Sequence, residues 1–175
     1  EVIVDQLFIR WAGPAGSPLV LTLGRQGLFI GEGFLVAEGT PLDETRTDYF
    51  NALRLDWRLS GKRSLTFFAC HQPETDSYFP VLNSRKRALF EQPVTGLGLI
   101  GSWKGEEREA EVATVFMKAR GGSHSLQEMN VLTFDGRGTL KPLPEVKVSG
   151  EAALQVGKKG RENLSSWGMN ARLAW

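Results

Sequence analysis

The chain contains few of the residues that build disulfides, metal centres or membrane-spanning helices. Its 175 residues include one cysteine, Cys70, which excludes an intrachain disulfide and a metal site built from cysteines. The two histidines, His71 and His124, lie far apart, with no carboxylate at metal-ligand spacing. No stretch approaches the roughly 20 apolar residues that a membrane helix needs. The formal net charge is only +1, so no nucleic-acid partner is expected.

What recurs instead is a two-residue alternation of apolar and polar side chains. One segment alternates Val146, Val148, Gly150, Ala152, Leu154 and Val156 with Lys147, Ser149, Glu151, Ala153, Gln155 and Gly157. Residues 48–58 and 166–175 repeat the pattern. Because successive side chains of a strand point to opposite faces, each segment has one apolar and one polar face. The pattern is typical of a soluble antiparallel sheet with its apolar face inward, and also of a transmembrane barrel with that face toward lipid.

Turn signals divide the chain into about nine strands. We expect these strands at residues 2–12, 19–26, 48–59, 64–70, 95–104, 108–119, 127–135, 146–156 and 165–175. The first five connections run short, long, short, long, short, whereas those near residues 121–124 and 157–160 are of medium length. Outer-membrane barrels pair short periplasmic turns with longer loops on the outer side. We therefore predict an all-β fold, an antiparallel up-and-down meander that forms part of a transmembrane β-barrel.

The tryptophans fall at or near the ends of the expected strands, in phase with apolar neighbours. They are Trp11, Trp57, Trp103, Trp167 and Trp175. Trp favours the membrane–water interface, where its ring is buried and its N–H remains wet. Core tryptophans of a soluble sheet are the alternative interpretation.

Four segments carry a resemblance to a known family. Residues 21–26 read Leu-Thr-Leu-Gly-Arg-Gln before a glycine-rich stretch, and residues 146–157 end in Gln-x-Gly. Residues 50–55 and 166–172 also match, in the right order. Together the segments resemble the alginate-export family of bacterial outer-membrane barrels. The resemblance implies that residues 1–175 form a single domain, an internal fragment of a larger barrel in the bacterial outer membrane.

In a barrel the polar face lines the lumen. The predicted pore-lining residues are Arg10, Arg25, Arg54, Asp56, Arg58, Lys147, Glu151, Gln155, Asn170 and Arg172. Arg25 is ambiguous, because strict alternation puts it on the lipid face unless a bulge at Gly24 turns it inward, or it sits near the interface. Cations outnumber acids in this set, which favours anions such as uronate polymers in a narrow pore. Charge pairing across strands, as wall scaffolding, is the alternative role.

The sequence predicts an outer-membrane channel for passive diffusion, with the lipid bilayer and a translocated solute as its partners. Small ions, nutrients, aromatic acids and an anionic polysaccharide all remain candidate solutes. No enzyme activity and no cofactor are expected, and the acidic run from Glu106 to Glu111 is interpreted as solvated charge after a hairpin turn. The alternative is a soluble β-sandwich or lipocalin-like binding module, in which large apolar side chains interdigitate on a buried face.

Overall fold

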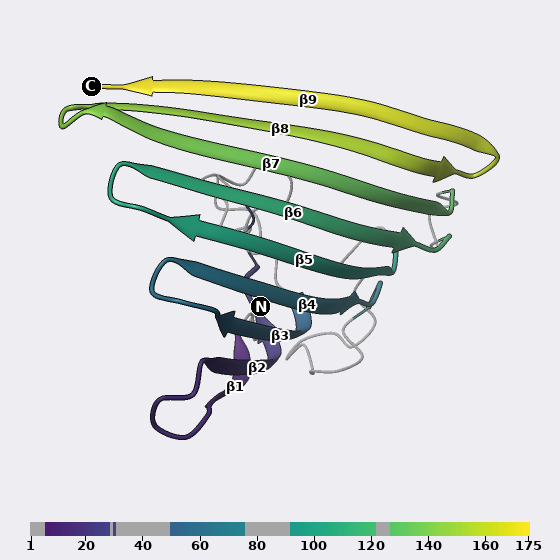
Figure 1. Cartoon of the computed structure of the whole chain (residues 1–175). Coiled ribbons are helices and arrows are strands. Elements are labelled where there is room, and N and C mark those ends of the chain that lie inside the picture. Colours follow the sequence, from purple (N-terminus) through teal and green to yellow (C-terminus); the bar gives the residue numbers. More distant parts are fainter. Residues whose placement is uncertain (1–5, 29, 31–49, 76–91, 122–126) are drawn as a thin grey trace, which may run out of the picture.

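The computed structural model describes residues 6–28, 30, 50–75, 92–121 and 127–175. Their strands are β1 (Leu7–Ala12), β2 (Leu19–Gln26), β3 (Phe50–Arg58), β4 (Arg63–Gln72), β5 (Val94–Lys104), β6 (Arg108–Ala119), β7 (Met129–Leu143), β8 (Val146–Lys159) and β9 (Glu162–Ala174). Each strand pairs antiparallel with the next in one sheet of nine strands (Figure 1). The predicted all-β meander is confirmed over these residues. None of them belongs to a helix long and apolar enough to cross a membrane.

The predicted boundaries match β2 and β6 and fall short at β7 and β8. The prediction ended β7 at Asp135, but Gly136 and Gly138 pair in register with β6 inside a strand that runs to Leu143. The predicted medium-length connection at residues 157–160 is wrong, because β8 continues to Lys159. Gly160, with a φ of 60°, opens the tight turn into β9.

Most short connections lie at one end of the sheet, and the long connections lie at the other. At one end, called here the short-turn end, the connections are residues 13–18, 59–62, 105–107 and 144–145. At the opposite end, called the long-loop end, they are residues 27–49, 73–93, 120–128 and the tight turn at 160–161. The expected alternation of short and long connections therefore holds for the first six strands and fails at the last hairpin.

The two faces of the sheet differ in chemistry and in exposure. Residues paired across strands share a face, and one face carries large exposed apolar side chains, including Ile9 (76% exposed), Trp167 (75%) and Met169 (72%). We call it the apolar face. Among the described strand residues, the buried side chains other than Arg25 lie on the opposite face, which we call the mixed face. The face that would form the core of a water-soluble sheet is thus the uncovered one.

The mixed face is not polar throughout. On β3 to β6 its half nearest the long loops is an apolar cluster that includes Ala52, Phe68, Ile100 and Val115. Leu28 and Ile30, which follow β2 in the chain, are buried in the same cluster, and Phe50 and Met117 pack against it. The expectation of a polar inner face is therefore corrected for this region.

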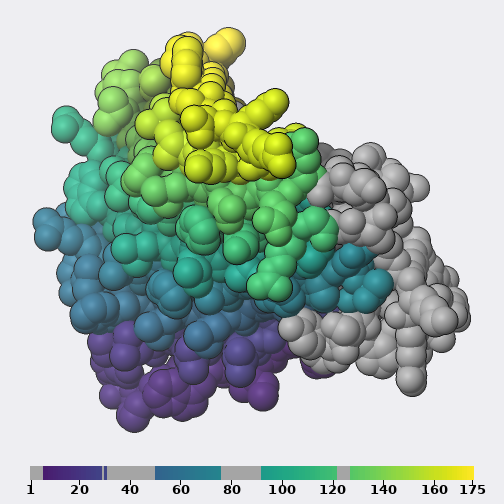
Figure 2. Space-filling view, turned by 90° about the vertical axis from the view of Figure 1, so that its right-hand side faces the viewer, coloured from purple at the N-terminus to yellow at the C-terminus, as the bar shows by residue number. Residues whose placement is uncertain are grey.

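The sheet is coiled and open. In Figure 1, β1 and β2 are turned away from the direction of β8 and β9, as the handed twist of strands requires. Figure 2 shows the strands as successive bands from β1 and β2 at one edge to β9 at the other. Within the described residues β1 pairs only with β2, and β9 only with β8, so the sheet has two free edges.

Candidate functional site

The charged part of the mixed face is built by strand register. Neighbouring strands place one polar residue each in a row across the sheet, which we call the central row. It consists of Arg58, Ser64, Ser102, Glu111, Arg137, Glu151 and Asn170, from β3 to β9. Side chains in such a row stand about 5 Å apart, close enough to interact directly.

Within the central row, one arginine lies between two glutamates. Arg137 on β7 pairs in register with Glu111 on β6 and with Glu151 on β8. Glu111 is partly buried and accepts a hydrogen bond from Ser102 Oγ at 3.0 Å, whereas Glu151 is only 3% exposed. A buried carboxylate is stable only when charge or hydrogen bonds compensate its lost hydration, and Arg137 is the cation that register places between the two glutamates.

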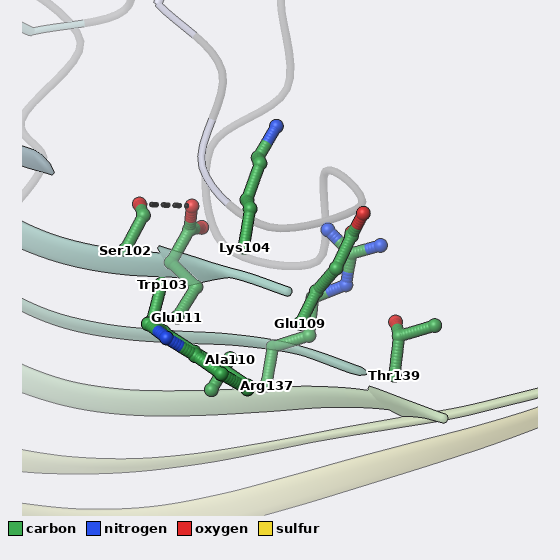
Figure 3. Close-up of a pocket in the computed structure, with 8 residues that line it drawn as sticks. All are labelled: Ser102, Trp103, Lys104, Glu109, Ala110, Glu111, Arg137 and Thr139. Atoms are coloured by element: carbon green, nitrogen blue, oxygen red, sulfur yellow. Dashed lines mark hydrogen bonds between the residues drawn. The ribbon is translucent and has the colours of Figure 1, made fainter. Parts of the chain in front are cut away.

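A hollow of about 230 Å³ lies beside this row, nearer the short turns. Figure 3 shows Ser102, Lys104, Glu109, Glu111 and Thr139 standing on the same side of the sheet, with Trp103 on the other side. The lining therefore combines two cations, two acids and two hydroxyl groups in one polar recess. Such a surface exchanges hydrogen bonds with a passing polar solute more readily than it holds an apolar one.

Asp135 is the least compensated charge of the site. It is 6% exposed and pairs in register with the small residues Ala113 and Ala153. Neither of its carboxylate oxygens accepts a hydrogen bond from a described residue. Its electrostatic neighbours are Glu111, Glu151 and Arg137, so β6 to β8 gather three acids around one arginine.

A second charged group lies on β3 and β4. Asp56 Oδ1 accepts hydrogen bonds from Arg54 Nε and Nη2, each at 3.0 Å, and from Thr66 Oγ1 at 2.7 Å. Because the two charged residues are two apart on one strand, they share a face. Their side chains are about one-third exposed, so the pair fixes the guanidinium more than it stabilises the fold.

Gln155 links the last three strands. Its Nε2 donates to Thr133 Oγ1 on β7 at 3.2 Å, and its Oε1 accepts from Ser166 Oγ on β9 at 3.3 Å. These three hydrogen-bonded residues lie in the same register row as Arg54 and Arg10. The predicted lining residues Arg10, Arg54 and Gln155, which are far apart in the sequence, therefore lie in one row across the sheet.

Comparison with protein-family models, with curated proteins and with solved structures finds no match. The resemblance to the alginate-export family therefore stays a prediction carried by its short motifs. In the described part of the chain, no three histidine, cysteine or acidic side chains are grouped so that they could hold a metal ion.

Arg25 is the one predicted lining residue that register separates from the others. It pairs with Asn51 and Leu7, in a row of the apolar face, and its side chain is fully buried. Its Nε donates to Asn51 Oδ1 at 3.2 Å. Gly24 has a φ of 130°, and the backbone of Leu7 and Phe8 on β1 lies so close to it that a Cβ atom would not fit. The pairing of β1 with β2 nevertheless continues past Gly24 without a shift in register, so there is no bulge that turns Arg25 inward.

The remaining predicted residues share the mixed face but differ in exposure. Arg10, Arg58, Lys147, Asn170 and Arg172 are exposed, whereas Glu151 is buried. The fully exposed charges of the predicted set are thus cationic, whereas its acids Asp56 and Glu151 are half-buried and buried.

Sequence reasoning missed part of the site. Glu109 and Glu111 were interpreted as solvated charge, but they alternate in phase with Ala113 and Val115 on the mixed face and are partly buried. That phase was readable in the sequence. Arg137 was missed because its strand was ended early at Asp135. His71 lies on the apolar face with its Nδ1 3.0 Å from Thr95 Oγ1, and His124 lies outside the described residues.

Proposed function

We propose that this chain is part of a transmembrane β-barrel of the bacterial outer membrane, through which a solute diffuses passively. The observation that carries the proposal is the exposure of the apolar face. With the exception of Phe8, Leu59, Leu143 and Trp175, every large exposed apolar side chain of the described residues lies on that face. Soluble monomers rarely expose an apolar surface that continues over a whole sheet, whereas lipid covers one without cost.

The length of the apolar stretch fits a bilayer. On β8 the apolar-face residues from Val148 to Val156 extend about 27 Å along the strand, or about 21 Å at a strand tilt of about 40°. The apolar band of an outer-membrane barrel is about 25 Å tall. Strands β7, β8 and β9, of 15, 14 and 13 residues, are also longer than the about 10 residues that a tilted strand needs to cross.

A barrel also accounts for the two free edges. Unpaired N–H and C=O groups are not tolerated in hydrocarbon, so a sheet that crosses a bilayer must close. We infer that further strands lie beside β1 and β9 and that this nine-stranded sheet is an arc of a larger barrel.

The charge pattern supports an anionic solute, such as a sugar acid or a uronate polymer. Arg58, Lys104, Lys147 and Arg172 are exposed on the mixed face, whereas Asp135 and Glu151 are buried there. A solute in the lumen would meet the cations first, and accessible cations lower the electrostatic barrier for an anion.

The competing function is a soluble binding module. It requires the apolar face to be covered by the protein itself, and the described residues place the covered cluster on the opposite face. That distribution favours the barrel.

The test is the location and gel behaviour of the full-length protein. An outer-membrane protein whose band shifts on heating would support the barrel, because closed barrels keep a compact shape in detergent until they are heated. Planar-bilayer recording would then measure its conductance. A water-soluble protein without a shifted band would overturn the proposal and favour the binding module.

A further inference from the structure

The apolar face ends, at the long-loop end, in an uninterrupted polar row. Register joins one residue from each strand between β2 and β9, and we call this set the boundary row. It consists of Arg25, Asn51, His71, Thr95, Lys118, Asn130, Lys158 and Asn163. Among the described rows of the apolar face, no other is polar on all of these strands. The row contains four basic residues and no acid.

We propose that the boundary row binds the phosphate group of an anionic lipid, principally through Lys118 and Lys158. This inference rests on the proposed membrane location. Lys118 and Lys158 are both exposed and flank Asn130 on the intervening strand. They stand two strand spacings apart, about 10 Å, which two flexible ammonium groups can close around one phosphate while the amide of Asn130 donates between them.

The position of the row selects a lipid rather than a free anion. It borders exposed apolar side chains such as Leu97 and Phe116, so its lysines lie where hydrocarbon gives way to headgroups. Lysine stems pack along apolar surface while the charged end reaches the headgroup layer. Basic side chains at that depth attract anionic lipids.

A groove beside the row offers a place for an acyl chain. It has a volume of about 580 Å³ and is lined by apolar residues, including Leu23, Leu53 and Leu97, with His71 and Thr95 among its polar members. Ala69 lies in register between Leu53 and Leu97, and the groove exists there because the alanine side chain is smaller than its leucine neighbours. Because Thr95 of the groove pairs in register with Lys118, the acyl groove lies next to the headgroup contacts on the same face of the sheet.

The experiment compares two lipids on the full-length protein, inserted into vesicles of phosphatidylcholine containing phosphatidylglycerol. Native mass spectrometry after extraction counts the lipids that remain bound. Each lysine neutralised by Lys118→Gln or Lys158→Gln should weaken the retention of phosphatidylglycerol relative to phosphatidylcholine about 5-fold, and the double variant about 25-fold. Lys159→Gln, one residue away on the mixed face, is the matched control and should change nothing.

Ala69→Leu fills the groove without adding charge. It should lower the retention of both lipids and leave their ratio unchanged. Inorganic phosphate, compared with chloride at equal ionic strength, should not displace phosphatidylglycerol, and displacement would show a free-phosphate site instead.

Four results would overturn the inference: an unchanged lipid ratio in the double variant, an equal loss in the Lys159→Gln variant, failure of the parent protein to prefer phosphatidylglycerol, or displacement of that lipid by inorganic phosphate. Insertion into vesicles of phosphatidylcholine alone separates the two proposals. Insertion without a lipid preference would contradict only the proposed lipid-binding site. Failure to insert would contradict both the proposed barrel and the proposed site.

Discussion

Leu154 tests which face of the sheet meets lipid. It is exposed on the apolar face, in register with Phe134 and Trp167. An arginine at the midplane of a bilayer costs about 2–4 kcal/mol on the lipid face of a barrel. Leu154→Arg should therefore abolish the heat-shifted band of the outer-membrane fraction.

The matched control for Leu154→Arg is Ser166→Arg. Ser166 is exposed on the mixed face of the neighbouring strand, and the same substitution there should assemble normally. A folded, water-soluble Leu154→Arg protein would contradict the membrane assignment of the apolar face.

Gly98 tests how tightly the mixed face is packed over β4 and β5. A Cβ atom at Gly98 would overlap the ring of Phe68, which is buried in the apolar cluster. Because overpacking a fixed site costs about 1–3 kcal/mol, Gly98→Ala should lower the temperature at which the heat-shifted band appears. Gly136→Ala has open space around the new methyl group and should leave that temperature unchanged. Equal behaviour of the two variants would show that Phe68 moves aside freely.

At the scale of the strand, the apolar–polar alternation predicts well that a strand exists and which face each side chain lies on, but it predicts poorly where the strand ends. It located β2 and β6 and put nearly all the predicted lining residues on one face, because a strand reverses side-chain direction at every residue. It failed at Gly136 and Gly138, since a glycine marks a turn or a strand interior equally well until its partner strand is known. Here the partner is β6, which presents Val112 and Ala110 opposite them.

The site was predictable only where its residues lie on recognised strands. Glu111, Arg137 and Glu151 form one row, but alternation within a single strand does not set which residues of different strands face each other. Register depends on turn length and on packing across the sheet. The cover that Leu28 and Ile30 give to the apolar cluster is likewise a long-range contact, with no local signal in the sequence.

Arg137 tests whether three adjacent strands depend on one charge. Arg137→Met leaves Glu111 and the buried Glu151 without the cation between them, so we expect lower stability at neutral pH. Adding Glu151→Gln removes one of the opposed charges and should restore part of the loss. The coupling energy of the double-mutant cycle should be about 1–3 kcal/mol, measured by urea unfolding in detergent. Strictly additive losses would show that the row contributes no mutual stabilisation.

At the scale of the whole molecule, the same sheet carries two kinds of boundary. Across the strands, the boundary row separates apolar side chains from the long-loop end, and Trp57 and Trp103 mark the apolar face near the short turns. Through the sheet, the exposed apolar face is backed by buried polar residues such as Thr133, Asp135 and Glu151. A slab of hydrocarbon on one side and water on the other explains both boundaries at once.

The exposed cations of the mixed face should set ion preference. Arg58 and Arg172 lie on β3 and β9 and are exposed, so Arg58→Ala and Arg172→Ala remove accessible positive charge without disturbing the Arg54–Asp56 pair. In a planar bilayer under a KCl gradient, the reversal potential of each variant should move toward that of a cation-selective pore. Because the Debye length falls from about 10 Å at 0.1 M salt to about 3 Å at 1 M, the shift in reversal potential should shrink as salt rises.

The matched control is Arg108→Ala. Arg108 is exposed and pairs in register with Leu140 on the apolar face, so this substitution should leave the reversal potential unchanged. An equal shift in that control, or none in Arg58→Ala and Arg172→Ala, would mean that the mixed face does not line the conducting path.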